Sequence, residues 1–295
     1  MLVSNDLDTL PAVFLVARIK SIPLVFDSHE YFTELPELVD RRFVRRVWMR
    51  LEKALLPKIQ HGYTVCQSIS KAYYDKYGVK LAVIRNLPMG TVQPQELYKQ
   101  KENKQPDLII YQGAINMGRG LETMIRAMTY LDLYRLQIFG EGTITGELVK
   151  LRDSLSLGQR VEFMGKIPFA KLGTYTRQAA LGISLEENIG LNYYYALPNK
   201  LFDYIQAGIP VLVSDLPEMS KIVSDFEIGQ VVRDRDPESL ALQVEEMMSS
   251  QEKRKKWKKN LHIAANELCW ENEVDKLREV YRDAGLIFPL THPSP

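Results

Sequence analysis

A glycine-rich segment with one basic residue follows an apolar run near the middle of the chain. It reads Gly-Ala-Ile-Asn-Met-Gly-Arg-Gly over residues 113–120, after the apolar run 108–111 and before a helical pattern over 121–128. Glycines at a strand-to-helix turn let backbone N–H groups approach an anion, and Arg119 would add a positive charge there. The spacing matches neither G-x-G-x-x-G nor a P-loop, which disfavours ordinary dinucleotide binding. The alternative is a turn with a solvated arginine.

A second segment, residues 186–211, combines acidic, basic and aromatic side chains at a predicted strand-to-helix connection. Pro198 suits the first turn of a helix, whose N–H groups together with Lys200 would stabilise a diphosphate. Asp203, on the same opening turns, would accept hydrogen bonds from a ribose diol. These groups fit a nucleoside diphosphate. The three tyrosines at 193–195 are either a platform for a sugar or a packed aromatic wall.

A single histidine lies in a charged loop near the start of the chain. The segment Asp-Ser-His-Glu-Tyr-Phe, residues 27–32, follows the apolar run 22–26. Open α/β sheets place ligands at the carboxyl ends of their strands, which is where this loop would lie. His29 is therefore a candidate site residue, and a structural histidine is the alternative. The other three histidines have no comparable setting.

Two series of alternating strands and helices would position these residues. In the first, an apolar helix over 11–20 precedes the strand 22–26, and a helix over 68–77, with a left-handed cap at Gly78, lies between short strands. The second series has five short apolar runs typical of buried strands, at 108–111, 135–139, 161–163, 181–185 and 210–213. Such alternation predicts α/β domains with parallel sheets. Beyond Asp236 the pattern predicts three helices, at 238–248, 251–267 and 270–284.

Composition restricts the class of protein. The chain has 295 residues, of which 45% are hydrophobic and 25% charged, so two packed domains are expected rather than a disordered or fibrous chain. A net charge of +1 gives no global field that would select nucleic acid. Cys66 and Cys269 are isolated, with no CxxC or Cys/His cluster, so no zinc site is expected. The acidic start lacks the pattern of a signal peptide, and no apolar run reaches the roughly 18 residues of a membrane span, which favours a cytoplasmic or peripheral protein.

The segment around residues 186–211 resembles the signature of family 4 retaining glycosyltransferases. Its two halves are Glu-Asn-Ile-Gly-Leu at 187–191 and Phe-Asp-Tyr-Ile-Gln-Ala-Gly-Ile-Pro-Val at 202–211. The resemblance implies the GT-B fold, with two Rossmann-like doubly wound domains and a nucleotide-diphosphate sugar as donor. In that family two glutamates eight positions apart contact the donor sugar and the ribose. Glu187 and Asp203 match them here at a spacing of sixteen.

The resemblance also assigns further donor-site residues. Arg119 matches the lysine of the family's basic pair, while Ala114 stands where its arginine would be and Lys200 would compensate. His29 resembles the histidine that approaches the donor sugar. Arg119, Lys200, Glu187 and His29 are thus the expected catalytic residues. The full expected donor site comprises Gly113, Arg119, Gly165, Lys166, Ile167, Glu187, Gly190, Leu191, Asn199, Lys200 and Asp203, with backbone groups near Lys166 and Ile167 framing the base.

The same resemblance divides the chain into regions. It implies a partial acceptor-side domain over 1–90, a linker over 91–106 rich in Gln, Lys, Glu and Pro, and a donor-binding domain over 107–269. A final helix over 270–285 would cross back to the first domain, and a tail would follow at 286–295. Members of the family carry about three further strand–helix units before the equivalent of Leu2, so the N-terminal domain is expected to be incomplete here.

The expected function is metal-independent transfer of a hexose from a UDP- or GDP-linked sugar, with retention, to a glycan or a lipid-linked acceptor. No cofactor is expected besides this co-substrate, and no nucleic acid partner. One alternative is a shortened, non-catalytic nucleotide-binding or interaction protein. Another is a nucleotide-sugar epimerase of the same fold, which would need more acid/base residues near the sugar than four histidines make available.

A basic amphipathic helix is predicted over 41–56. Apolar residues such as Phe43, Val44 and Val47 alternate there with five arginines. Such a helix lies either on an anionic membrane surface or over a domain core with its basic face in solvent.

Overall fold

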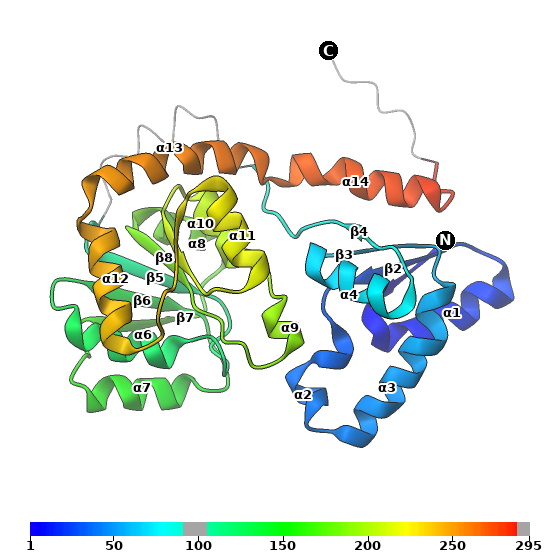
Figure 1. Cartoon of the computed structure of the whole chain (residues 1–295), viewed down its shortest axis with the longest axis horizontal. Helices are drawn as coiled ribbons and strands as arrows, with labels where there is room; N and C mark the ends of the chain where they lie inside the picture. Colours follow the sequence, from blue (N-terminus) through cyan, green and yellow to red (C-terminus); the bar gives the residue numbers. More distant parts are fainter. Residues whose placement is uncertain (91–104, 288–295) are drawn as a thin grey trace, which may run out of the picture. The chain divides into compact units, whose positions relative to one another are not determined.

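The computed structural model describes residues 1–90 and 105–287, which form two compact units (Figure 1). The first comprises residues up to Asn86, together with Gly190–Tyr195 and the chain from Glu271. The second comprises Leu87–Ile189 and Ala196–Trp270. Most of the predicted linker and tail, residues 91–104 and 288–295, lies outside the described residues.

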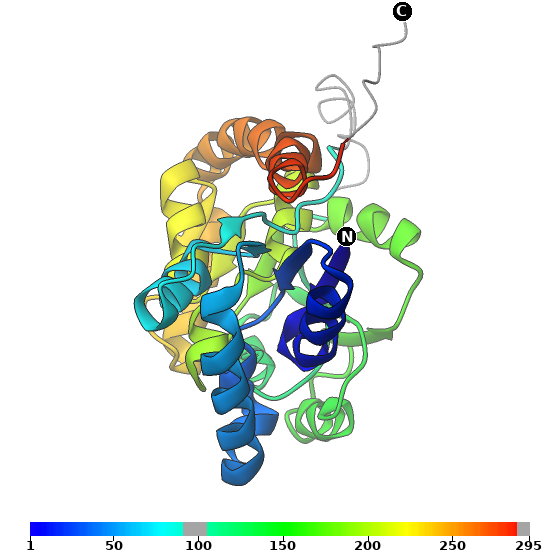
Figure 2. The same cartoon turned by 90° about the vertical axis from the view of Figure 1, so that its right-hand side faces the viewer.

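The first unit contains a four-stranded parallel sheet in the order β1-β2-β3-β4. Its strands are β1 (Leu2–Asn5), β2 (Leu24–Ser28), β3 (His61–Thr64) and β4 (Ala82–Val83). Its helices of four residues or more are α1 (Asp6–Lys20), α2 (Pro36–Val39), α3 (Arg42–Leu55), α4 (Gln67–Tyr77), α9 (Leu191–Tyr194) and α14 (Trp270–Asp283). Helices α1 and α3 pack side by side (Figures 1 and 2). Helix α4 ends at Gly78 with φ +69°, which confirms the left-handed cap.

A buried carboxylate ties together the elements of the first unit. Glu52 of α3 is fully buried and accepts hydrogen bonds from Thr33, from Lys76 at 3.0 Å and from Tyr77. A buried charge is tolerated only where it is paired and hydrogen-bonded, as it is here. Helix α14 is joined to this unit by a second ion pair, in which Arg85 donates to Glu273 at 2.8 Å.

The second unit contains a six-stranded parallel sheet in the order β10-β9-β8-β5-β6-β7. Its strands are β5 (Leu108–Gln112), β6 (Arg135–Phe139), β7 (Val161–Gly165), β8 (Leu181–Ser184), β9 (Val211–Val213) and β10 (Gly229–Val231). If these strands are renumbered 1 to 6 in chain order, the sheet order is 6-5-4-1-2-3. This is the strand order of a Rossmann-like doubly wound sheet, and its switch point lies between β5 and β8. The predicted α/β fold with two parallel sheets is therefore confirmed.

Helices cover both faces of the second sheet. On one face lie α6 (Leu121–Ala127), α7 (Thr145–Ser154) and α12 (Pro237–Ser249); on the other lie α8 (Phe169–Gln178), α10 (Asn199–Gln206), α11 (Pro217–Phe226) and α13 (Gln251–Glu267) (Figure 1). Strand β5 is buried over its whole length, as expected for a central strand of a covered parallel sheet. No helix among the described residues is both long and apolar enough to cross a lipid bilayer.

Candidate donor site

The loops that follow β5 and β8 meet at the switch point of the second sheet. The amide of Glu187 donates to the carbonyl of Gly118 at 2.9 Å. Gly120 has φ +69°, and a Cβ there would lie 2.1 Å from the carbonyl oxygen of Leu185. Only glycine fits that position, because a side chain would push the two loops apart. Open α/β sheets bind ligands at the carboxyl ends of the strands at such a point.

Lys200 lies beneath the first of these loops. Its Nζ is 4.0 Å from the centre of the Tyr111 ring, and a Cβ on Gly113 would lie 3.3 Å from its Cε. Lys200 is the second residue of α10, so its ammonium adds to the positive end of that helix dipole. The helix begins at Asn199, and Pro198 precedes it in an extended conformation rather than forming its first turn as predicted.

Lys200 pairs with a buried glutamate, Glu186, that was not among the predicted site residues. Glu186 Oε1 accepts from Lys200 Nζ at 2.8 Å and lies 3.7 Å from Arg119, while Oε2 accepts from Ser184 Oγ at 2.7 Å. Burial alone would raise the pKa of Glu186, but the charge and hydrogen bond of Lys200 hold it below its ordinary value. The carboxylate thus stays ionised and neutralises one of two neighbouring cations.

Arg235 holds the backbone of the same loop. Its guanidinium donates to the carbonyls of Leu185 and Glu186 and, at 2.6 Å, to Ser214 Oγ. Only the Glu186–Glu187 doublet was a signal in the sequence, and it does not reveal which glutamate points inward. Glu187 itself is half-buried, at the end of the loop.

Asp203 lies one turn beyond Lys200 and is also held from within the unit. Its Oδ2 accepts from Gln112 Nε2 at 2.7 Å, and Gln112 Oε1 accepts from Thr176 Oγ1 at 2.8 Å. Burial raises the pKa of Asp203 to about 6, although the Gln112 hydrogen bond acts in the opposite direction. Gln112 was not predicted as a site residue. Its position as the polar last residue of an otherwise apolar strand could have indicated it.

The remaining predicted residues of this unit extend the site along the sheet edge. Gly113 donates its amide to Phe139, and Gly140 donates to Gly165 at 2.9 Å, so the loops after β5, β6 and β7 adjoin. Lys166 and Asn199 are exposed, and Ile167 is half-buried. Gly190 and Leu191 belong to the first unit together with α9. In that unit Tyr195 packs against Tyr194 and Tyr31, which agrees with the aromatic-wall interpretation.

His29 occupies the carboxyl end of the first sheet and is fixed at two points. Its amide donates to Asp6 Oδ1 at 2.8 Å, and its Nε2 lies 2.9 Å from Asp27 Oδ1. Asp27 Oδ2 accepts in turn from the Tyr63 hydroxyl at 2.9 Å. Burial lowers the pKa of His29, but the hydrogen bond and charge of Asp27, with the charges of Asp6 and Glu30, raise it overall.

We expect Asp27→Asn to lower the pKa of His29. Asparagine retains an oxygen that accepts from Tyr63 but removes the negative charge that stabilises the imidazolium. An NMR titration of the imidazole protons measures the change. Asp40→Asn, at an exposed position of the same unit, is the control and should leave the titration unchanged. An unchanged His29 pKa in Asp27→Asn would show that the pair does not control the imidazole.

Comparison with solved structures shows the same fold over most of the chain. HepE from Anabaena, solved with UDP, covers 95% of this chain and 78% of its own, with a TM-score of 0.75 and 15% identity. Sucrose-phosphate synthase from Thermosynechococcus elongatus covers 95% and 72%, with a TM-score of 0.74 and 20% identity. WaaG, a glycosyltransferase involved in lipopolysaccharide biosynthesis, covers 92% and 81%, with a TM-score of 0.67 and 15% identity. These are GT-B glycosyltransferase structures, so the expected GT-B fold is confirmed.

Sequence comparison identifies the family. A curated D-inositol 3-phosphate glycosyltransferase from Nocardiopsis dassonvillei is 26% identical over 202 residues, which are 66% of this chain and 44% of the relative. The chain thus spans less than half the length of that relative. The family model described as glycosyl transferases group 1 matches residues 92–262, more than half of the chain. The chain therefore belongs to the group 1 glycosyltransferases, the family indicated by the resemblance in its sequence.

Proposed function

We propose that the chain transfers a hexose, with retention, from a UDP- or GDP-linked sugar to a glycan or lipid-linked acceptor. The observation that carries this proposal is the pair of cations, Arg119 and Lys200, at the switch point of a Rossmann-like sheet. Two cations and the start of α10 suit a leaving diphosphate, which carries more negative charge as its bond to the sugar breaks. HepE was solved with UDP and with UDP-glucose, so uridine donors are the first to test.

The proposed reaction is a front-face displacement. The bond between the anomeric carbon and the diphosphate breaks through an oxocarbenium-like state, and the acceptor oxygen bonds to the same face of that carbon. The leaving phosphate takes the proton of the acceptor hydroxyl. Arg119 and Lys200 stabilise the departing charge, so no chain residue serves as a nucleophile.

Other residues are proposed to bind the donor before the reaction. Asp203 accepts hydrogen bonds from the ribose, and the backbone at Gly165, Lys166 and Ile167 frames the base. Glu187 and His29 contact the sugar. The remaining proposed contacts are with Gly113, Gly190, Leu191 and Asn199.

Calorimetric titration with UDP, GDP and their glucose conjugates tests the donor proposal. We expect binding of one nucleotide, weakened about tenfold or more in Arg119→Ala, because a charge-assisted hydrogen bond contributes about 1.5–3 kcal/mol. Arg126→Ala, on the exposed face of α6, the helix that follows Arg119 in the chain, should bind as the wild type does. No binding to the folded wild type would reject the donor site. Binding without transfer to any saccharide acceptor would favour the non-catalytic alternative.

We further propose that α3 attaches the protein peripherally to anionic membranes. Phe43 is 75% exposed, and Val44 and Val47 are also exposed, although the sequence pattern alone allowed this apolar stripe to cover a core. Arginines flank the stripe on the same helix. Apolar side chains beside cations are the combination that binds the interface of an anionic bilayer.

Arg46→Gln should weaken binding to vesicles that contain phosphatidylserine about fivefold. Each basic residue near an anionic surface contributes about 1 kcal/mol, and this contribution falls as salt screens it. Co-sedimentation at two salt concentrations measures the change. Lys259→Gln, on the exposed part of α13, is the control. Binding that responds neither to salt nor to anionic lipid would contradict this membrane proposal.

A further inference from the structure

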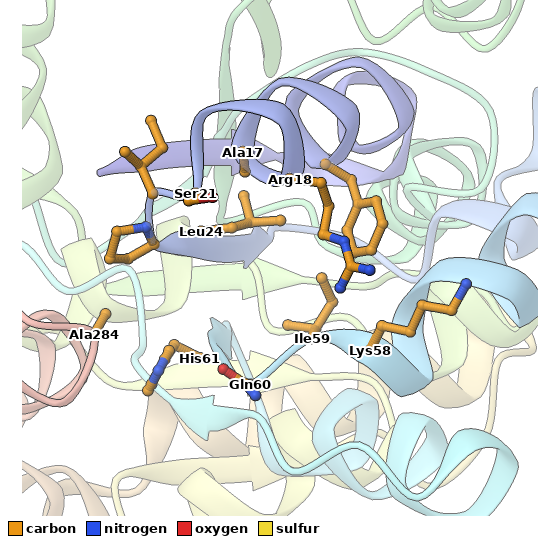
Figure 3. A pocket seen from close by; sticks show the side chains of 12 residues that line it. Ala17, Arg18, Ser21, Leu24, Lys58, Ile59, Gln60, His61 and Ala284 are labelled. Atoms are coloured by element: carbon orange, nitrogen blue, oxygen red, sulfur yellow. The ribbon is translucent and has the colours of Figure 1, made fainter.

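A pocket of about 590 Å³ lies in the first unit at the amino ends of β2 and β3 (Figure 3). Leu24, the first residue of β2, and His61, the first residue of β3, both line it. Asp27 lies towards the carboxyl end of β2, as does Tyr63 in β3. A strand of five residues is about 13–17 Å long, so the pocket is separate from the edge that carries His29. Its volume is within the range of about 300–1,000 Å³ typical of small-molecule sites.

Two basic side chains line the pocket and face one aromatic ring. The Arg18 guanidinium lies 6.0 Å from the centre of the Phe14 ring, and the Lys58 ammonium lies 5.9 Å from it. None of the residues that line the pocket is acidic. Within residues 1–90 and 105–287, neither Arg18 nor Lys58 forms an ion pair, in contrast to Lys200 in the second unit.

The placement of two cations beside one pocket needs a physical explanation, because like charges repel each other. Arg18 and Lys58 each lie in the last turn of a helix, α1 and the 3-10 helix Leu56–Lys58, and so offset the negative ends of the helix dipoles. That contribution does not require both charges to face the same ring or the same hollow. Two like charges in one pocket repel each other, and an anion between them would remove that cost.

Polar side chains complete the lining. Gln60 and His61 lie between the basic side chains and Ala284 in the view of Figure 3. In the described part of the chain, the side chains of Gln60, His61 and Ser21 make no hydrogen bond to other residues, so their donors and acceptors are available to a ligand. The pocket thus combines two cations with hydroxyl, amide and imidazole groups, and apolar residues such as Ile59 and Ala17 also line it.

We propose that this pocket binds a phosphomonoester of a sugar or polyol. Arg18 and Lys58 would hold the dianionic phosphate, because guanidinium and ammonium groups are the usual protein partners of phosphate oxygens. Ser21, Gln60 and His61 would hydrogen-bond the hydroxyl groups. This site is distinct from the donor site proposed above, since every residue that lines it belongs to the first unit and lies at the opposite end of its strands.

Titration of the full chain with glucose 6-phosphate, inorganic phosphate and glucose tests the proposal. We expect glucose 6-phosphate to bind more tightly than inorganic phosphate, and glucose not to bind measurably. Arg18→Gln and Lys58→Gln should each weaken glucose 6-phosphate binding about tenfold. Lys20→Gln, also in the last turn of α1 but outside the pocket, should have no effect. All three positions are exposed, so thermal unfolding should be the same in every variant.

Several outcomes would overturn this inference. Glucose 6-phosphate binding that persists in Arg18→Gln/Lys58→Gln, or that saturating UDP abolishes by competition, would place the ligand elsewhere. Equal affinity for inorganic phosphate would remove the role of the hydroxyl groups. Loss of vesicle binding in the double variant, with glucose 6-phosphate binding unchanged, would assign Arg18 and Lys58 to a lipid surface instead. UDP binding should be unaltered in the same variants. A result that rejects the phosphomonoester pocket can therefore be told apart from one that rejects the proposed donor site.

Discussion

Replacing Lys200 with alanine is expected to lower the turnover of the nucleotide sugar by about 30- to 1,000-fold. Loss of one preorganised group that stabilises developing charge costs about 2–4 kcal/mol of transition-state stabilisation. Lys200 is preorganised because its stem lies under Gly113, and its ammonium is fixed by Tyr111 and Glu186. Such a group does not have to reorganise when the leaving diphosphate becomes more negative.

The same substitution also destabilises the fold, and this effect has to be separated from catalysis. Among the residues that the structure describes, removing Lys200 leaves the side chain of the fully buried Glu186 with Ser184 and the more distant Arg119 as partners. Breaking a buried ion pair costs about 3–5 kcal/mol, and the lower value is expected here because those two groups remain. Lys200→Ala/Glu186→Gln removes both charges and should recover most of the stability while turnover remains low.

Steady-state kinetics and chemical denaturation of the three variants give the necessary comparison. Lys221→Ala is a matched control, since Lys221 forms an exposed pair with Asp225 on α11 and should change neither property by much. Turnover within twofold of the wild type in folded Lys200→Ala would remove Lys200 from the mechanism. Turnover that recovers together with stability in the double variant would make its role purely structural.

Much of the second sheet could be predicted because its strands are buried on both faces and appear as short apolar runs. Strand β6 was predicted over its observed residues, 135–139, and the other four predicted strands differ from those observed by one or two residues at an end. Strand β10 was missed, because Gly229-Gln230-Val231 is short and lies at the sheet edge, where a continuous apolar run is not required.

The partners of the site residues could not be predicted in the same way. Glu186 and Lys200 are fourteen positions apart, on a loop and a helix, and only the packing of α10 against β8 brings them together. The pairing of Gln112 with Asp203 spans 91 positions. Periodicity shows which face of an element is apolar, but it gives no distance between polar groups on different elements. The exposed apolar stripe of α3 shows a further limit of periodicity: an amphipathic pattern does not tell whether other elements cover its apolar face.

Asp203→Asn is expected to raise the free energy of unfolding by about 3 kcal/mol near pH 7.5, while weakening donor binding. Burial raises the pKa of Asp203 to about 6 from an ordinary value of 3.8, and each pKa unit corresponds to about 1.4 kcal/mol. A carboxyl whose pKa is higher in the folded state binds protons more tightly there, so its contribution to stability is fully present below the unfolded pKa of 3.8 and is lost as the pH rises to the folded pKa of about 6. Asparagine removes that cost and retains an oxygen that accepts from Gln112.

The pH dependence provides the test of this prediction. The stability advantage of Asp203→Asn should be smallest below about pH 4, grow as the pH rises from about 4 to about 6, and level off above that. Urea unfolding at intervals across that range measures it, and Asp225→Asn, an exposed aspartate of the same unit, should differ little from the wild type. If the difference in free energy of unfolding between Asp203→Asn and the wild type does not vary with pH, then the ionisation of Asp203 does not destabilise the fold. Residues that bind a ligand are often retained although they destabilise the fold. Greater stability of Asp203→Asn together with weaker UDP binding would therefore support both the raised pKa of Asp203 and its role in binding the ribose.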